Sequence, residues 1–499
     1  MNTYGAEIEK AIANKNDQSV HLVGDSYFVR LEKAATARKT PTTMHVSDVD
    51  QKTVIGVVSK DLGEQGLDNG FNLLETAIDY QYSLPDLQKK IELDMSTSQN
   101  ALHAEGASII NFSIHPLGKR DMETYKKTVA PKTLYKYIWN RGFDHSAGID
   151  ARAQNSPGTG TTVVQSADAV SVIMGAGAAF IGIFANSPFE EGKLSPYKEA
   201  RSTMWKRMMG NSLSKGDWTT AQFPKNRFRT LAQYFTWMFG ENTHMHFVLS
   251  NEEKAANYKS KGNKIVLIPK NPSLLEFLSK KNWDGVYLLD VLQNSAATST
   301  EIITPTIQDL ELLQWSQFAG ARVRFNLKPD CFSPEAFVAA CADQNGTKVE
   351  RLFENGVSNI YIEGRDPGAN FADAQIHDAG KDIADSVVIS PSALQAGLLQ
   401  NLKNSIKYID SIPWETLGNL RNEAIKNGLH GESNGIKVYD FAQRIVELAH
   451  EGLSQDDQKF LAYPNWVLQT KQNGADRALE LFNKNKSIQK TIAARYTIV

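Results

Sequence analysis

Two kinds of hydrophobic periodicity follow one another along the chain. Apolar residues at every second position predict strands, and apolar residues at every third or fourth position predict helices. The predicted strands cover residues 3–9, 53–58, 71–77, 107–113, 161–165, 264–268, 321–327 and 359–365. The predicted helices cover residues 84–104, 132–140, 167–184, 197–209, 228–239, 307–318, 347–355, 436–452 and 475–485. Because long irregular segments separate the strands, we expect an α+β fold with a curved, mostly antiparallel sheet surrounded by helices.

The strand predicted over residues 359–365 carries an acid and a base on one face. Apolar Ile360 and Ile362 alternate with Glu363 and Arg365, so a period of two points both charged side chains the same way. A carboxylate and a guanidinium in this arrangement either satisfy each other as an ion pair or grip a metal-bound phosphate. The strand alone does not decide between these two interpretations.

The first predicted strand and a second segment are acidic in a similar way. In TYGAEIEK, Glu7 and Glu9 share one strand face, and LDNGFNLLETAID places Asp68 before a strand and Glu75 within it. A single one of these acids is readily explained by pairing with an arginine. Acids on several distant strands instead suggest one shared site, and carboxylate oxygens are the ligands that Mg²⁺ prefers.

Several well-known signatures are absent from the sequence, and this limits the chemistry. There is no GxxxxGK[ST], no GxGxxG between a strand and a helix, no HExxH, no pair of CxxC motifs and no GxSxG. His244 and His246 form an HxH, which is more typical of a structural pair when no third ligand lies nearby. Carboxylates therefore remain as the candidate metal ligands.

The composition is that of an ordinary globular protein of 499 residues. It is 41% hydrophobic and 22% charged with a formal net charge of -2, which gives no bulk attraction to nucleic acid or to an anionic membrane. Cys331 and Cys341 are too few for a disulfide framework, and the N-terminus lacks the pattern of a signal peptide. We therefore expect a reducing, cytoplasmic setting.

One apolar segment, residues 167–185, is nearly long enough to cross a bilayer. It contains Asp168, Ser171 and several glycines, and no basic flank follows it closely. A helix packed on all sides within a large core is the better interpretation.

Five short motifs, in order along the chain, resemble the glutamate–cysteine ligase family. They are GAEIEK (5–10), LDNGFNLLET (67–76), FANSPFEEGK (184–193), ARSTMW (200–205) and YIEGRD (361–366). The ANSPF-x-x-G-K run followed by R-S-x-x-W is the most specific of these motifs. Weaker similarity extends the resemblance from near residue 3 to about residue 485.

The resemblance implies a fold related to glutamine synthetase, in which a curved antiparallel sheet forms an active-site funnel. It implies one large catalytic domain over residues 1–499, with a helical C-terminal part from about residue 390. The implied reaction is the formation of γ-glutamylcysteine: the γ-carboxylate of L-glutamate attacks ATP, and the amine of L-cysteine displaces phosphate from γ-glutamyl phosphate. Phosphoryl transfer of this kind needs charge neutralisation and positioning rather than a nucleophilic side chain.

The resemblance also assigns roles to individual residues. The implied ligands of two or three Mg²⁺ ions, or of Mn²⁺, are Glu7, Glu9, Asp68, Glu75 and Glu363. Arg365 would act on the transferring phosphoryl group, together with Glu363, and Arg322 and Arg324 would lie near the nucleotide phosphates. Arg201 and Trp205 would line the glutamate pocket, with Arg201 on the α-carboxylate. Gln165 or His145 would be a polar residue near the metal ions.

Two other functions stay open at this point. The enzyme could join glutamate to an amine other than cysteine, because the region that would recognise the second substrate is the least similar to the family. The chain could also be a catalytically silent relative that binds nucleotide, although a dead site has no need to hold so many like charges together. The expected partners are small-molecule substrates, without nucleic acid or membrane, for a monomer or a homodimer.

Overall fold

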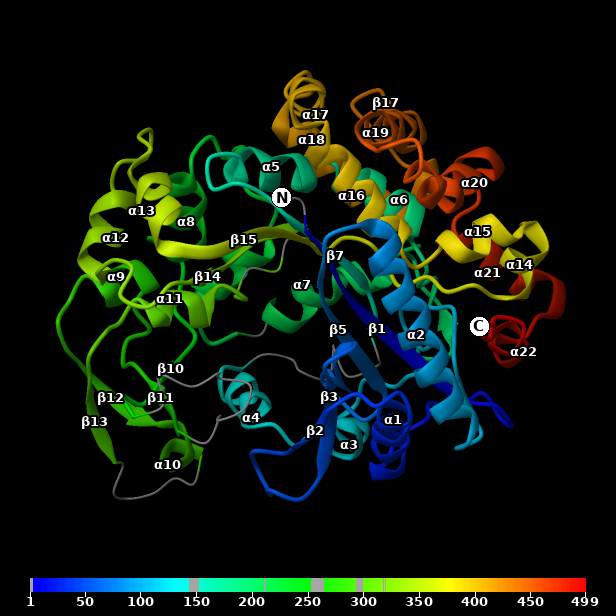
Figure 1. Ribbon diagram of the computed structural model, residues 1–499, viewed down its shortest axis with the longest axis horizontal. Helices are drawn as coiled ribbons and strands as arrows, with labels where there is room; N and C mark the ends of the chain where they lie inside the picture. The colour runs from blue at the N-terminus through cyan, green and yellow to red at the C-terminus, as the bar shows by residue number, and fades with distance from the viewer. Residues whose placement is uncertain are drawn as a thin grey trace.

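The computed structural model describes residues 3–142, 152–210, 212–252, 264–292, 299–316, 318 and 320–499. Its centre is a nine-stranded sheet. The strands of this sheet are β1 (Tyr4–Asn14), β2 (Thr42–Val46), β3 (Val54–Ser59), β4 (Gly63–Leu67), β5 (Leu73–Gln81), β6 (Ala107–Ile109), β7 (Asn155–Gly160), β14 (Ala321–Leu327) and β15 (Val357–Gly364). They lie in the order β14-β15-β7-β1-β5-β4-β3-β2, with β6 paired to β1 (Figure 1).

Every neighbouring pair in this sheet is antiparallel, and the sheet is not closed into a barrel. The expected fold class, a large antiparallel sheet surrounded by helices, is confirmed. The predicted strands at residues 3–9, 71–77, 321–327 and 359–365 correspond to β1, β5, β14 and β15. Alternating apolar residues therefore identified the strands that carry most of the charged candidates.

One strand, β7, lies outside its predicted position. The expected strand at residues 161–165 is not formed, and the preceding segment NSPGTG is the strand instead. Proline and glycine disfavour strands in general. Here Gly160 allows close packing, because a Cβ on it would approach Thr3 Oγ1 to 2.2 Å, whereas a Cβ on Gly158 would make only an ordinary contact with the Tyr361 ring at 3.6 Å.

The helices account for most of the remaining chain. They are α1 (Asp25–Ala37), α2 (Leu84–His103), α3 (Met122–Thr128), α4 (Thr133–Asn140), α5 (Ser166–Gly175), α6 (Gly177–Phe184), α7 (Met204–Gly210), α8 (Leu231–Phe239), α9 (Leu274–Leu278), α10 (Leu288–Leu292), α11 (Gln308–Leu313), α12 (Pro334–Cys341), α13 (Lys348–Gly356), α14 (Ala374–Ala379), α15 (Lys381–Ser386), α16 (Ser390–Gln400), α17 (Leu402–Ile409), α18 (Trp414–Asn427), α19 (Val438–Gly452), α20 (Ala462–Thr470), α21 (Gly474–Asn485) and α22 (Ile488–Ala493). Smaller strands form a four-stranded sheet, β10 (Val248–Leu249), β11 (Ile265–Leu267), β12 (Trp283–Tyr287) and β13 (Thr300–Ile303), and two hairpins, β8 (Phe189–Glu190) with β9 (Lys193–Leu194) and β16 (Glu432–Ser433) with β17 (Ile436–Lys437).

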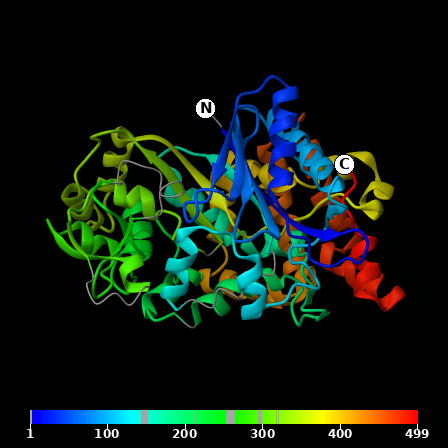
Figure 2. The same cartoon turned by 90° about the horizontal axis from the view of Figure 1, so that it is seen from below.

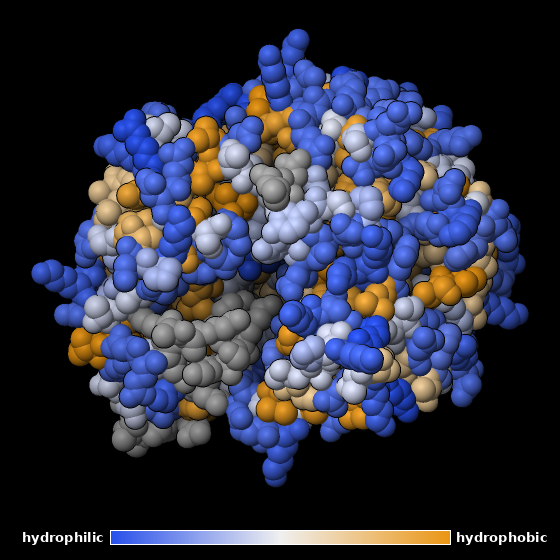
Figure 3. All heavy atoms as spheres, viewed as in Figure 1, coloured by the Kyte–Doolittle hydropathy of each residue, from blue (hydrophilic) through white to orange (hydrophobic). Residues whose placement is uncertain are grey.

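The four-stranded sheet and the C-terminal helices lie at opposite ends of the molecule (Figure 2). On the face shown in Figure 3, apolar side chains are scattered among polar ones. The chain's division into domains stays a prediction.

Helices α2 and α16 cover one face of the main sheet, which we call the back face. Gln395 of α16 donates to Thr159 Oγ1 (3.0 Å) and to the Pro157 carbonyl (3.2 Å) of β7. Helices α1 and α5 continue this layer, because α1 packs against α2 and β3, and α5 packs against α16 and β15. The opposite face of the sheet carries the acids predicted from the sequence.

The apolar segment predicted as one helix is two. It breaks at Ala176 into α5 and α6, whose axes are bent by 47°. Within the described residues no single helix is long and apolar enough to span a membrane, and this bent pair passes that test by length and composition. Almost every residue of the pair is buried within the protein, as expected from the sequence.

A buried ion pair joins β1 to α2 on the back face. Lys10 Nζ lies 2.7 Å from Asp94 Oδ2, and both side chains are fully buried. Lys10 also donates to Thr76 Oγ1 (2.7 Å), which in turn donates to Asp94 Oδ1 (2.8 Å). Asp94 Oδ1 accepts a further bond from Gln65 (2.8 Å). This network fixes β1, β4 and β5 to α2 directly behind Glu9, which neighbours Lys10 in the chain.

Candidate active site

A cavity of about 490 Å³ opens on the sheet face opposite α2 and α16. Its walls come from the sheet, from α4, from α7 and from the small sheet through β10 and β11. The predicted site residues that line it are Glu7, Glu9, Asp68, Glu75, Arg201, Trp205, Arg322, Arg324 and Arg365. Residues far apart in the sequence therefore share one site, and the volume is in the range of small-molecule pockets.

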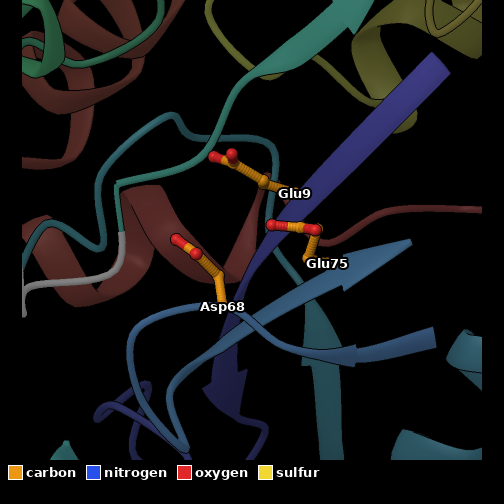
Figure 4. A group of neighbouring side chains, drawn as sticks. All are labelled: Glu9, Asp68 and Glu75. Atoms are coloured by element: carbon orange, nitrogen blue, oxygen red, sulfur yellow. The ribbon is translucent and has the colours of Figure 1, made fainter. Parts of the chain in front are cut away.

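Glu9, Asp68 and Glu75, which we call the acidic cluster, converge on one point of this cavity (Figure 4). Each offers a carboxylate oxygen, and these oxygens lie within 4.8 Å of one another. Glu9 on β1 is directly opposite Glu75 on β5, and cross-strand partners point to the same face. Asp68 follows β4 by one residue, and its backbone carbonyl accepts bonds from Tyr135 Oη (2.6 Å) and Lys132 Nζ (3.0 Å).

The acidic cluster holds like charges together, with Glu9 buried and Asp68 and Glu75 partly buried. Burial raises the pKa of Glu9 well above its ordinary value of 4.5, and the nearby charges of Asp68 and Glu75 raise it further. Arg365 and Arg201 oppose this effect in part. A divalent cation would relieve the repulsion, and three convergent carboxylates suit the hard, oxygen-preferring Mg²⁺. Within the described part of the chain, this is the only such group of three or more potential ligands.

Arg322, Arg324 and Arg365, which we call the arginine cluster, surround the carboxylate of Glu363. The distances from Glu363 are 2.7 Å to Arg322 Nη2, 2.9 Å to Arg365 Nη1 and 3.7 Å to Arg324 Nε. Burial by itself would raise the pKa of Glu363, but the three guanidinium groups outweigh it and lower this pKa to about 2. The cluster retains an excess of positive charge beside the cavity.

This arrangement describes the surroundings of Glu363, whose expected role as a metal ligand stays a prediction. The residue is 3% exposed and does not belong to the acidic cluster, although it was expected to bind a metal ion. The antiparallel register places Arg322 directly opposite Glu363, so an ion pair forms across the two strands. Glu363 also pairs with Arg365, so the ion pair that the sequence suggested for this strand is formed.

Arg365 and Trp205 lie together at the side of the arginine cluster. The Arg365 guanidinium carbon is 5.8 Å from the centre of the Trp205 ring, within the range of a cation–π contact. Trp205, on α7, also packs against Phe318 with ring centres 4.4 Å apart. The aromatic rings form an apolar wall next to positive charge.

Arg201 lies in the cavity wall but is already engaged by the protein. Its Nε donates to Glu199 (2.8 Å) and its Nη1 donates to Gln154 Oε1 (3.1 Å). Its Nη2 donates to the backbone carbonyls of Arg365 (3.3 Å) and Asp366 (2.9 Å). These contacts occupy most of the N–H groups of its guanidinium, and its expected role on the substrate α-carboxylate stays a prediction.

The remaining predicted residues lie in different places. Glu7 lines the cavity from β1, opposite Ser156, but does not belong to the acidic cluster. Gln165 is exposed at the start of α5, where it accepts a bond from Thr162 Oγ1 (3.0 Å), and it does not line the cavity. His145 lies outside the described residues.

Several residues of the cavity were not identified from the sequence. They include Lys132, Tyr135, Arg152, Gln154 and the pair His45 and Glu64, whose Nδ1 and Oε1 are 3.2 Å apart. Arg152 and Gln154 come from the loop that precedes β7, where alternation of polar residues was the available signal. Lys132 has no such signal, because its position depends on the backbone carbonyls of Leu67, at the end of β4, and Asp68.

Comparisons with known proteins bear on this site. Residues 5–254 match the sequence model of the Glutamate-cysteine ligase family 2. Among solved structures, the glutamate–cysteine ligase of Francisella tularensis in complex with AMP is similar, with 11% identity, a TM-score of 0.45, and coverage of 99% of this chain and 86% of that one. A bifunctional glutathione synthetase from Pasteurella multocida is similar with 9% identity, a TM-score of 0.44, and coverage of 99% and 50% respectively.

No curated protein matches the chain. The family match includes Glu9, Asp68 and Glu75 and half of the sequence. The chain therefore belongs to the Glutamate-cysteine ligase family 2.

Proposed function

We propose that the protein is an ATP-dependent ligase that joins the γ-carboxyl group of L-glutamate to the amine of L-cysteine through γ-glutamyl phosphate. The observation that carries this proposal is the placement of the acidic cluster and the arginine cluster around one cavity. Cations held by carboxylates and fixed guanidinium groups are the two devices that neutralise a triphosphate. Membership of the family supports the same reaction.

The acidic cluster would hold Mg²⁺ through Glu9, Asp68 and Glu75, with Glu7 close by on the same strand face. When bound, the ion would supply charge neutralisation of the phosphate oxygens. That two or three ions bind, and that Mn²⁺ can replace Mg²⁺, remain part of the proposal. Glu363 is left out of the ligand set because arginines occupy its carboxylate.

The arginine cluster would bind the transferring phosphoryl group. Among the residues that the structure describes, neither Nε of Arg322 nor Nε of Arg365 has a hydrogen-bond partner, although both atoms are buried. A buried donor without an acceptor costs free energy that an anionic ligand would recover. Arg365 also has the planar fork that contacts two phosphate oxygens at once.

The proposed reaction needs no covalent help from the protein. The glutamate γ-carboxylate is itself the nucleophile, so the chain has to align it with the phosphate, neutralise charge and keep water away. The apolar wall of Trp205, Phe318 and Met208 is suited to excluding water from an acyl phosphate.

The test is release of phosphate from ATP in the presence of Mg²⁺. We expect release to require L-glutamate and to rise when L-cysteine is added, with γ-glutamylcysteine as the product. A panel of amino acids and amines distinguishes cysteine from another acceptor, because the true acceptor gives the largest kcat/KM and its own γ-glutamyl product. ATP binding without glutamate-dependent release for any acceptor would contradict the proposal and indicate a silent relative.

A further inference from the structure

Arg201 connects the two charged halves of the cavity. It is 4% exposed, and four of its hydrogen bonds go to other parts of the protein. One bond reaches Gln154 on the side of the acidic cluster. Two reach the backbone carbonyls of Arg365 and Asp366 on the side of the arginine cluster.

The contact with Gln154 leads directly to Glu9. The backbone N–H of Gln154 donates to Glu9 Oε2 (2.9 Å), and its carbonyl accepts from the Glu9 backbone N–H (2.9 Å). The Glu9 carboxylate therefore takes its orientation from the backbone at residue 154. Arg201 holds that residue through its side-chain oxygen at 3.1 Å.

The two carbonyl contacts fix the segment that follows β15. The Arg365 backbone N–H donates to the Gly320 carbonyl (2.8 Å), and the Asp366 carboxylate pairs with Arg421 of α18 (2.5 Å). Arg201 adds bonds to both residues of this segment. The backbone from which the Arg365 side chain extends is therefore fixed by hydrogen bonds to Gly320 and to Arg201.

The charge of Arg201 is balanced locally by Glu199. Glu199 is fully buried, and besides Arg201 it accepts bonds from the Asn186 backbone N–H (2.7 Å) and Ser187 Oγ (3.0 Å). A bidentate clamp on a substrate carboxylate uses two parallel N–H groups of one guanidinium. With four bonds already made inside the protein, Arg201 has little capacity left for such a clamp.

We propose that Arg201 is a positioning residue, which sets the placement of the Glu9 carboxylate relative to Arg365 and does not clamp the glutamate substrate. This inference rests on the proposed function, because it assigns Glu9 to the cation and Arg365 to the phosphoryl group. Groups that orient a metal ligand from behind commonly change metal affinity by about 10- to 100-fold when they are altered.

The test compares Arg201→Lys with the wild type. Lysine keeps the charge, but a single nitrogen cannot reach Gln154 and both carbonyls together. We expect Mn²⁺ binding, measured by electron paramagnetic resonance without substrates, to weaken about tenfold or more. We expect kcat to fall while the KM for glutamate changes less than about threefold, which a clamp would not give.

Two further variants keep the test decisive. Gln154→Met removes the side-chain acceptor of Arg201 but keeps the backbone N–H on Glu9, and it should weaken Mn²⁺ binding in the same direction. Arg477→Lys is the matched control: Arg477 is 1% exposed and donates to the Gln472 carbonyl (2.8 Å) and Tyr463 Oη (2.9 Å), and it does not line the cavity. It should leave Mn²⁺ binding unchanged.

The inference is overturned in favour of a clamp if two results occur together. The Mn²⁺ affinity is unchanged in both Arg201→Lys and Gln154→Met, and the KM for glutamate rises more than about tenfold in Arg201→Lys. Mn²⁺ binding is measured without turnover. If the wild type fails to release phosphate with glutamate, the proposed function fails, while the comparison of Mn²⁺ affinities still decides the role of Arg201.

Discussion

Replacing Glu363 by glutamine removes the carboxylate that three arginines surround and should lower the free energy of unfolding by about 3 kcal/mol at pH 7. The magnitude comes from its pKa of about 2, compared with an ordinary value of 4.5, at about 1.4 kcal/mol per pH unit of difference. Breaking a buried ion pair by removing one partner costs a similar amount, about 3–5 kcal/mol. The residue is 3% exposed, so solvent screening reduces this value little.

The sign of the pH dependence follows from the lowered pKa. The stabilisation is fully present above pH 4.5, and it is lost as the pH falls through the folded-state pKa of about 2. The difference between the wild type and Glu363→Gln should therefore be largest near neutral pH and should shrink below pH 4. Urea unfolding followed by tryptophan fluorescence at pH 7 and at pH 3.5 measures both quantities.

A matched control is Glu350→Gln. Glu350 is 7% exposed and accepts a bond from the Leu231 backbone N–H (2.7 Å), which a glutamine oxygen can replace, so we expect a change of about 1 kcal/mol or less. Glu363→Gln should also abolish phosphate release, because Arg365 loses its anchor, while Mn²⁺ affinity stays within about threefold. If Glu363→Gln cost no more than the control, or if it abolished Mn²⁺ binding, the assignment of Glu363 as the counter-ion of the arginine cluster would be refuted.

Three further predictions concern β1. Glu9→Gln should abolish Mn²⁺ binding yet raise the thermal midpoint of the metal-free protein at pH 8. A raised pKa means that ionised Glu9 costs stability as the pH rises through that pKa; an equal or lower midpoint in EDTA contradicts this. The Mg²⁺ concentration that gives half-maximal phosphate release should rise as the pH is lowered, because Glu9 must lose its proton to bind the ion and its pKa is raised. A flat dependence argues against Glu9 as a ligand. Lys10→Met should cost about 3–5 kcal/mol in urea unfolding by leaving Asp94 without its cation, and the double change Lys10→Met with Asp94→Asn should recover most of this loss; a double variant no more stable than the single one refutes the reasoning.

The strands that carry the site could be predicted because their apolar residues alternate. In β1, Ile8 is buried and its neighbours Glu7 and Glu9 line the cavity, as the period of two requires. The alternating pattern does not predict strands that are built from glycine, proline and small polar residues. Strand β7 consists of small residues and proline, and β4 (GEQGL) contains two glycines, so neither carries an alternating signal.

The sequence pattern also does not predict helices that lack a polar face, because they show no amphipathic periodicity. Most residues of α16 (SPSALQAGLLQ) are buried between the sheet and α19, so no amphipathic stripe marks it. Among the site residues, the acidic cluster could be anticipated from its strands. The pairing of Glu363 with Arg322 could not, because it depends on the register between β14 and β15, which neither strand specifies alone. The contacts of Arg201 depend on backbone carbonyls far away in the sequence.

Strand β7 is a spacer of fixed width between the negative and the positive halves of the cavity. It pairs with β1 on one side and with β15 on the other, so these two strands lie about 10 Å apart, two strand spacings. Opposite charges at that separation create an electric field across the sheet that is built into the hydrogen-bond ladder and needs no ligand. A polyanion carrying a cation at one end would be attracted in one orientation and repelled at both ends in the other. The hydrogen-bond ladder of the sheet thereby determines the orientation in which such a ligand enters the cavity.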